Sequence, residues 1–239
     1  MSNGKLVVIE GACDGIGKST QVKALKEHLE KDGEEIYTHH FPTYGSLQGK
    51  PVEEYLAGKY GKPSELSPYF INALYAEDRA ITWLSVLKEI YDRSGIILLD
   101  RYTTSSLIYQ SALIKDEDEK KRFIDYVIDF EYNKIGIKEP DNVIFLQAPF
   151  EVVSEMRKAR QTNDGVSNDI HERDLEFMKD VYQSALFVAD YLDWDKIQCA
   201  DGEKMRSVED IHEEVYGLVK RRNNSRNSKS NWQKDRFVL

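Results

Sequence analysis

Cysteine is almost absent from this sequence, which has only Cys13 and Cys199 among its 239 residues. Two cysteines without metal-type spacing exclude a disulfide framework and a cysteine-based metal site, and they favour a reducing, cytoplasmic setting. No apolar run approaches the roughly 20 residues that a transmembrane helix needs. The N-terminus also lacks the pattern of a signal peptide. We therefore expect a cytoplasmic protein that makes no contact with a membrane.

Positive charge is also scarce, because the chain carries a net charge of −9 at pH 7. This balance argues against nucleic-acid binding by the body of the protein. The end of the chain differs, since residues 220–239 contain seven basic residues and one acidic residue. Residues 222–239 are polar as well as basic, so we expect a disordered tail. Such a tail can contact RNA or another anionic partner, but a solvated tail is the simpler interpretation.

Apolar strands and amphipathic helices alternate along the chain. This alternation predicts an α/β fold with a five-stranded parallel sheet and helices on both faces, in one domain spanning residues 1–221. A long periodic segment is expected to form one helix, with Ser67 as its N-cap and Gly95 as its stop. The predicted strands are residues 5–10, 35–41, 96–100, 142–148 and 196–200, and the clearest other helices are residues 19–33, 102–114, 116–134, 151–160, 171–192 and 208–220.

A glycine-rich stretch, GACDGIGKST at residues 11–20, joins the first strand to the first helix. Backbone N–H groups and a helix N-terminus face an anion at such a junction. Lysine at position 18 suits the β- and γ-phosphates of a nucleotide, and the hydroxyl of Ser19 suits Mg²⁺. The pattern predicts an ATP-binding loop formed by Gly15, Ile16, Gly17, Lys18, Ser19 and Thr20.

The spacing of this loop is irregular. The usual form G-x-x-x-x-G-K-[ST] requires a glycine where Ala12 stands, and Gly11 lies one residue too early. We expect the extra residue to form a bulge at residues 11–13 that faces away from Lys18. The sequence leaves open whether this bulge displaces Asp14.

A second chemical motif, LLDRYTTSSLIYQ, begins at the end of the third predicted strand. Asp100 closes that strand, where ligands bind in open α/β sheets, and a carboxylate there can hold Mg²⁺ through water. Arg101 beside it suits a phosphate group. In the alternative interpretation Asp100 only caps the following helix and Arg101 is an ordinary surface residue.

The motif D-R-Y-x-x-S-x-x-x-Y-Q, formed here by Asp100, Arg101, Tyr102, Ser105, Tyr109 and Gln110, resembles the signature of thymidylate kinases. The resemblance runs from about residue 5 to residue 218 and includes the glycine-rich loop, Phe41-Pro42 and the helix LSPYFINALYAEDR. It implies a P-loop kinase three-layer fold with a short lid at about residues 157–172. It also implies transfer of a phosphoryl group from ATP, with Mg²⁺, to dTMP, and a homodimer.

The resemblance further implies which side chains meet the substrates. Tyr75 and Arg79 share a helix face, so the tyrosine would stack on the base while the arginine reaches a carbonyl or phosphate. Read without the family pattern, they are a core tyrosine and a surface arginine. Ser19 and Asp100 would hold the metal. The full set of expected dTMP-binding residues is Asp14, Phe41, Pro42, Tyr75, Arg79, Arg101, Ser105, Tyr109 and Gln110.

The expected catalytic residues are Lys18, Asp14 and Arg101, together with Arg157 and Arg160 from the lid, because the glycine-rich loop contains no arginine. Many family members also carry an arginine beside the Phe-Pro turn, where this chain has His40, Thr43 and Tyr44. We therefore expect the acceptor phosphate to contact Arg79, Arg101 and His40.

Two other functions remain in view. A deoxynucleoside kinase would need a carboxylate after the second strand to deprotonate a hydroxyl, and HHFPTYG offers none. A catalytically silent nucleotide-binding module is disfavoured because Lys18, Ser19 and Asp100 are all present.

Overall fold

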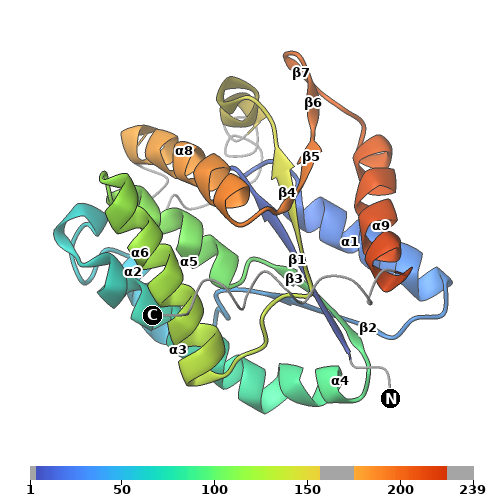
Figure 1. Cartoon of the computed structure of the whole chain (residues 1–239), viewed down its shortest axis with the longest axis horizontal. Coiled ribbons are helices and arrows are strands. Elements are labelled where there is room, and N and C mark those ends of the chain that lie inside the picture. The colour runs from blue at the N-terminus through green and yellow to red at the C-terminus, as the bar shows by residue number, and fades with distance from the viewer. Residues whose placement is uncertain (1–3, 157–174, 225–239) are drawn as a thin grey trace.

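The computed structural model describes residues 4–156 and 175–224, with side chains as far as Arg221. Its centre is a five-stranded parallel sheet in the order β2-β3-β1-β4-β5. This confirms the predicted α/β fold, and each predicted strand is present (Figure 1). The strands are β1 (Lys5–Gly11), β2 (Ile36–His40), β3 (Ile96–Asp100), β4 (Asn142–Gln147) and β5 (Asp195–Gln198).

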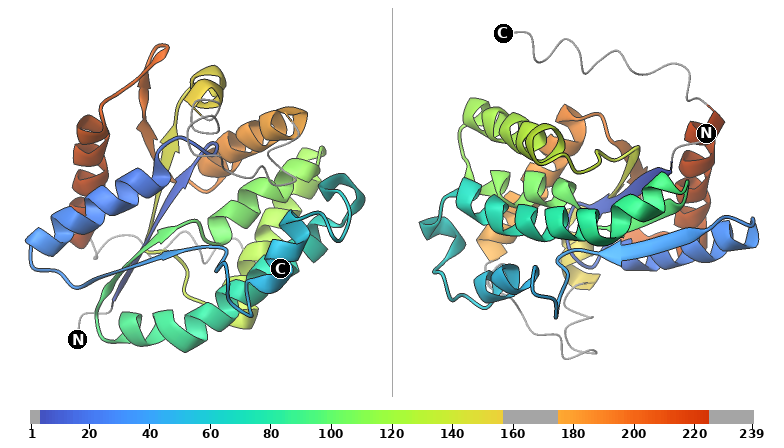
Figure 2. Two further views of the ribbon diagram at one scale, coloured as in Figure 1. Left: turned by 180° about the vertical axis from the view of Figure 1, so that it is seen from behind. Right: turned by 90° about the horizontal axis from the view of Figure 1, so that it is seen from below.

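Helices cover both faces of this sheet, as Figures 1 and 2 show. On one face, α1 and α9 lie side by side and pack on inward side chains such as Val7 and Ile9. Side chains of the opposite parity, such as Leu6 and Val8, pack on the other face beneath α4 and the π-helical turn that precedes it, Trp83–Leu87. The described helices are α1 (Lys18–Lys31), α2 (Lys50–Leu56), α3 (Pro68–Thr82), α4 (Lys88–Asp92), α5 (Thr103–Tyr109), α6 (Glu117–Ile128), α8 (Leu175–Tyr191) and α9 (Val208–Asn224), with a further helical stretch at residues 150–156.

Burial on both faces explains why the central strands β1 and β3 are rich in apolar residues along their whole length. All five residues of β3 are buried, and so are all seven of β1. Parallel strands between two helical layers have no solvent face, so the sequence shows no alternation of polar and apolar residues there. Because β1, β2 and β3 are parallel, their carboxyl ends meet at one edge of the sheet, where the candidate site lies.

Several helices are less regular than predicted. Ser67 is the N-cap of α3, where its side chain accepts a hydrogen bond from the Tyr69 N–H. The expected single helix then passes through a π-helical turn, Trp83–Leu87, into α4. A second π-helical turn, Asp129–Ile135, follows α6. Amphipathic periodicity does not distinguish a π-turn from an α-turn over so few residues, so neither π-helical turn could be predicted.

The C-terminal half differs from expectation in two places. A short antiparallel ribbon, β6 (Ala200–Asp201) with β7 (Lys204–Met205), follows β5 and was not predicted. Helix α9 continues to Asn224, beyond the expected domain boundary at residue 221. The predicted lid and residues 225–239 lie outside the described part of the chain, so the division into domain, lid and tail stays a prediction. None of the described helices is long and apolar enough to span a bilayer.

Candidate active site

The glycine-rich loop leaves the central strand β1 and leads directly into α1. Gly15 and Gly17 have φ angles of 94° and 101°, in the left-handed region that side chains with a Cβ rarely adopt. Gly17 is the N-cap residue of α1 and no side chain caps the helix there. The first N–H groups of α1 are therefore left to face an anion, as the loop pattern predicts.

The extra residue of this loop does not face away from Lys18, so that expectation was wrong. The Ala12 N–H still bonds to the Leu146 carbonyl at 3.0 Å, which continues the pairing of β1 with β4. The next carbonyl, that of Cys13, points to Lys18 and accepts a hydrogen bond from its Nζ at 3.2 Å. Gly11 is also close-packed, since a Cβ there would come within 2.6 Å of Ile16 Cγ2. The bulge is thus folded onto the lysine.

Asp14 is the point where the two sequence motifs meet. Its Oδ1 accepts a hydrogen bond from Lys18 Nζ at 3.1 Å and forms an ion pair with Arg101. Its Oδ2 accepts a hydrogen bond from the Tyr109 hydroxyl at 2.9 Å. Burial alone would raise the pKa of Asp14, but the charges of Arg101 and Lys18 outweigh it and hold that pKa well below its usual range. The bulge therefore leaves Asp14 at the centre of the site.

Arg101 reaches Asp14 from an unusual backbone conformation. Its φ is +69°, which is uncommon for a residue with a side chain and is often found at functional sites. Asp14 raises the pKa of the Arg101 guanidinium, against the opposing effect of burial. Arg101 Nη1 also donates to Ser105 Oγ at 3.3 Å.

The two expected metal ligands lie together. Ser19 Oγ donates a hydrogen bond to Asp100 Oδ2 at 2.5 Å, and His40 Nδ1 lies 3.4 Å from the same oxygen. Burial raises the pKa of Asp100, but the His40 contact and the nearby cations lower it to about 2. The other oxygen, Oδ1, is buried and has no hydrogen-bond partner among the described residues. A hydroxyl and an ionised carboxylate with a free oxygen are the donors that Mg²⁺ prefers.

Glu10 is a site residue that the sequence analysis missed. It is fully buried at the end of β1, where its Oε2 accepts hydrogen bonds from Ser105 Oγ at 2.6 Å and Thr104 Oγ1 at 2.9 Å. These contacts fix the start of α5 against the central strand. The available signal was an acidic residue at the end of an otherwise apolar strand, since such a residue stays buried only when it is paired.

Arg79 is not a surface residue, so the alternative reading of this position was wrong. Its side chain is 1% exposed, and it forms two hydrogen bonds of 2.7 Å with the fully buried Glu131. Arg79 Nη2 also donates to Ser106 Oγ at 2.9 Å, and Thr103 Oγ1 donates to Glu131 at 2.8 Å. The charge of Arg79 is therefore balanced within the protein. Glu131 was missed because it stands in the charged segment that reads as an exposed helix.

The remaining expected substrate residues lie on α3, in the turn after β2 and at the end of α5. Tyr75, one helical turn before Arg79, is half-buried with its ring edge-on to Tyr55. Phe41 is buried, and the chain after Pro42 is held to α3 because the Asp78 carboxylate accepts a 2.7 Å hydrogen bond from Thr43 N–H. Gln110 Oε1 and Asn72 Nδ2 are buried without hydrogen-bond partners in the described chain. Such orphaned polar atoms mark positions where a ligand can complete the bonding.

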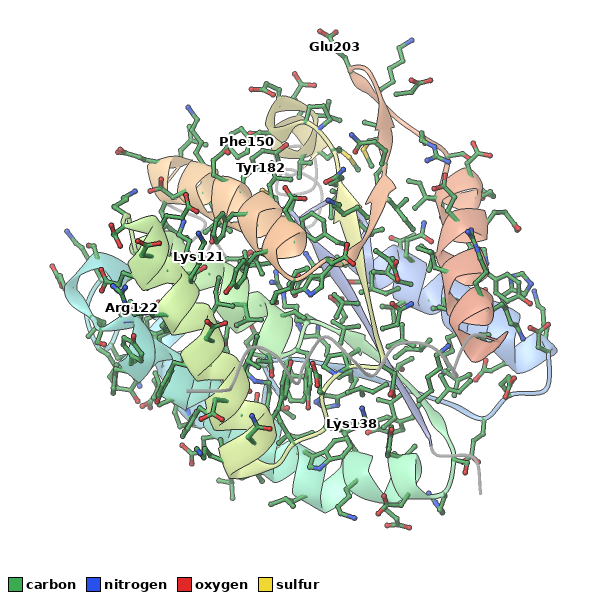
Figure 3. The ribbon with its side chains drawn as sticks, viewed as in Figure 1. Lys121, Arg122, Lys138, Phe150, Tyr182 and Glu203 are labelled. Atoms are coloured by element: carbon green, nitrogen blue, oxygen red, sulfur yellow. The ribbon has the colours of Figure 1, made fainter. Side chains whose placement is uncertain are left out.

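Arg157 and Arg160 lie outside the described residues, so their expected role stays a prediction. The segment that leads to them is anchored to α8. Phe150 and Tyr182 project toward one another (Figure 3), with ring centroids 5.4 Å apart, and the Tyr182 hydroxyl donates to the Ala148 carbonyl at 3.1 Å.

Comparison with known proteins agrees with this geometry. Residues 9–215 match the family model described as thymidylate kinase. The chain is 32% identical over 178 residues to the thymidylate kinase of Mycobacterium tuberculosis, covering 73% of this chain and 80% of that one. It is 31% identical over 221 residues to a probable thymidylate kinase of Thermococcus gammatolerans, covering 90% and 96%. The structure of thymidylate kinase from Candida albicans superposes with a TM-score of 0.70 at 22% identity, over 94% of this chain and 95% of that one, which shows the shared fold.

The Arg79–Glu131 pair gives a test of stability. We expect Glu131→Gln to lower the free energy of unfolding by about 3–5 kcal/mol, because it leaves a buried guanidinium uncompensated. Urea denaturation monitored by circular dichroism measures this. The control is Glu89→Gln, which breaks the exposed pair with Arg93 and should cost less than about 1 kcal/mol. An equal loss of unfolding free energy in the two variants would contradict the conclusion that Glu131 balances a buried charge.

Proposed function

Since the chain belongs to the thymidylate kinase family, we propose that it phosphorylates dTMP to dTDP with ATP as the donor. The observation that carries the proposal is the contact of Asp14 with both Lys18 and Arg101. Through this one carboxylate, the glycine-rich loop, which suits the phosphates of ATP, is in contact with the motif after β3, which suits dTMP. A single site between the ends of β1 and β3 can therefore hold both nucleotides.

Residues 15–20 would bind the phosphates of ATP. The N-terminus of α1 supplies backbone N–H groups, and Lys18 supplies a positive charge. The attacking group is a phosphate oxygen of dTMP, which is already a nucleophile at neutral pH. The protein therefore has no need of a covalent intermediate, and it contributes by positioning the two groups and by stabilising charge.

Charge balance in the site supports a requirement for metal. Among the described residues, Lys18 and Arg101 both contact the carboxylate of Asp14, and the carboxylates of Asp100 and Glu10 lie close enough to act on these charges as well. This set cannot neutralise the phosphates of two nucleotides. Ser19 and Asp100 would hold Mg²⁺, which supplies positive charge to the phosphate oxygens when bound. Arg157 and Arg160 remain our candidates for further positive charge from the lid.

The acceptor base would lie near Tyr75, Arg79 and Gln110. Because Glu131 already balances the charge of Arg79, we assign this arginine to a neutral carbonyl of the base and no longer to the acceptor phosphate. That leaves Arg101 and His40 for the phosphate, with Asp14 and Tyr109 beside the deoxyribose. Phe41, Pro42 and Ser105 would complete the wall of the pocket.

The acceptor is tested by ADP release from MgATP with dTMP, dUMP, thymidine or no acceptor. We expect turnover with dTMP and none with thymidine, because no described carboxylate follows β2 to deprotonate a hydroxyl. Lys18→Ala should reduce kcat on the order of 10²–10³-fold while the protein stays folded. Turnover with thymidine alone would identify a deoxynucleoside kinase, and no turnover with any acceptor would identify a silent module.

We also propose a homodimer formed through α3 and the π-helical turn that follows it. Phe70, Ile81 and Leu84 are 44%, 42% and 69% exposed, and their spacing places them on one face of this continuous helix. A second copy of the chain would cover this face. Leu84→Arg should convert the dimer to a monomer in size-exclusion chromatography with light scattering, and a wild type that is already monomeric would contradict the proposal.

We also propose that the protein is located in the cytoplasm. Cys13 and Cys199 are both buried and neither forms a disulfide bond among the described residues, which fits a reducing compartment such as the cytoplasm. Cell fractionation tests this, and recovery of the protein in an oxidising compartment would contradict it.

A further inference from the structure

Two histidines face one another between α1 and α9, away from the proposed active site. His28 lies on α1 and His212 on α9, and Nδ1 of the first is 2.9 Å from Nε2 of the second. Glu213 follows His212 on α9. One ligand atom from each of these three residues lies within 4.8 Å of the others. The two helices pack side by side along one face of the sheet (Figures 1 and 2).

We propose that His28, His212 and Glu213 bind one divalent transition-metal ion of the Zn²⁺ class. Two imidazole nitrogens and a carboxylate oxygen are a donor set that suits Zn²⁺, with water in the remaining position. Each imidazole would turn its lone pair to the ion and keep its proton on the other ring nitrogen. Nothing in the proposed kinase reaction uses these three residues.

The distances require only small adjustments. With Zn–N bonds of about 2.0–2.1 Å and tetrahedral angles, two ligand nitrogens lie about 3.3 Å apart. The imidazole nitrogens therefore need to separate by a few tenths of an ångström and to rotate toward a common point. Both histidines are half-buried and Glu213 is exposed, so the carboxylate can swing into place from the solvent side.

The surroundings hold the His28 ring in a fixed orientation. The His28 ring stacks on Tyr216 with centroids 3.8 Å apart and planes 3° apart, and the Tyr216 hydroxyl donates to Asp32 at 2.7 Å. Lys220 forms an ion pair with Asp32 at 2.8 Å, so the carboxylate balances the positive charge of the lysine.

A metal at this position would fasten the C-terminal helix to the helix that begins at the phosphate loop. Lys18 is the first residue of α1 and His28 lies near its other end, so the ion would stabilise the packing of α9 without touching the nucleotides. The expected consequence is a higher melting temperature, because an ion that binds only the folded state stabilises it by mass action.

The experiment uses the full chain freed of metal by EDTA dialysis. Co²⁺ titration followed by visible absorption, and then competition by Zn²⁺ in calorimetry, should show one ion bound per chain. His28→Gln and His212→Gln should each weaken Zn²⁺ binding by at least about tenfold. Glu213→Gln, which changes an exposed side chain, should weaken it by a smaller factor. Zn²⁺ should raise the melting temperature of the wild type and leave that of His212→Gln unchanged.

The matched control is Glu209→Gln, an exposed acid on the same helix, which should bind Zn²⁺ as the wild type does. Three results would overturn the proposal. One is unchanged Zn²⁺ affinity in both histidine variants. Another is a thiolate charge-transfer band with Co²⁺, which would assign the ion to Cys13 or Cys199. The third is wild-type binding no tighter than millimolar, which would mean an adventitious ion only.

Discussion

The contact of Asp14 with Lys18, Arg101 and Tyr109 is the interaction on which the site depends. It joins the loop after β1, the first residue of α1, the residue after β3 and helix α5 through one carboxylate. Without that carboxylate, Lys18 and Arg101 would lose the one anion that both of them contact among the described residues. The lowered pKa of Asp14 expresses the same fact, because its charged form is the one that the surrounding groups stabilise.

The site is also organised before any nucleotide binds. Arg101 is paired with Asp14, and Arg79 is paired with Glu131, so both guanidinium groups are fixed by the protein itself. A fixed donor costs little reorganisation when its ligand arrives, which is the general advantage of a preorganised site. The cost is that little net positive charge is left for phosphate, and this gap is what ties the proposed reaction to Mg²⁺ and to cations from the lid.

The sequence predicted those parts of the molecule that repeat a local pattern. The alternation of strand-like and helix-like segments located all five strands. The two motifs located Lys18 and Ser19 at the start of α1, and Asp100 and Arg101 at the end of β3. Glu131 could not be found in this way, because its importance lies in a partner distant along the chain, Arg79. Glu10 showed a local signal, an acidic residue closing an apolar strand, but its partners Thr104 and Ser105 are likewise distant along the chain. The prediction of the direction of the bulge was wrong for a related reason. The Ala12 N–H bonds to the Leu146 carbonyl on β4, a strand distant along the chain, and this contact constrains the loop that follows.

The central claim is that Asp14 and Arg101 act as one unit between the two motifs. A double-mutant cycle tests it most directly, with kcat/KM for dTMP measured in Asp14→Asn, Arg101→Met and the double variant. Coupled residues in contact deviate from additivity by about 0.5–3 kcal/mol. We predict that the double variant is impaired much less than the product of the two single losses. Losses that simply multiply would contradict the account.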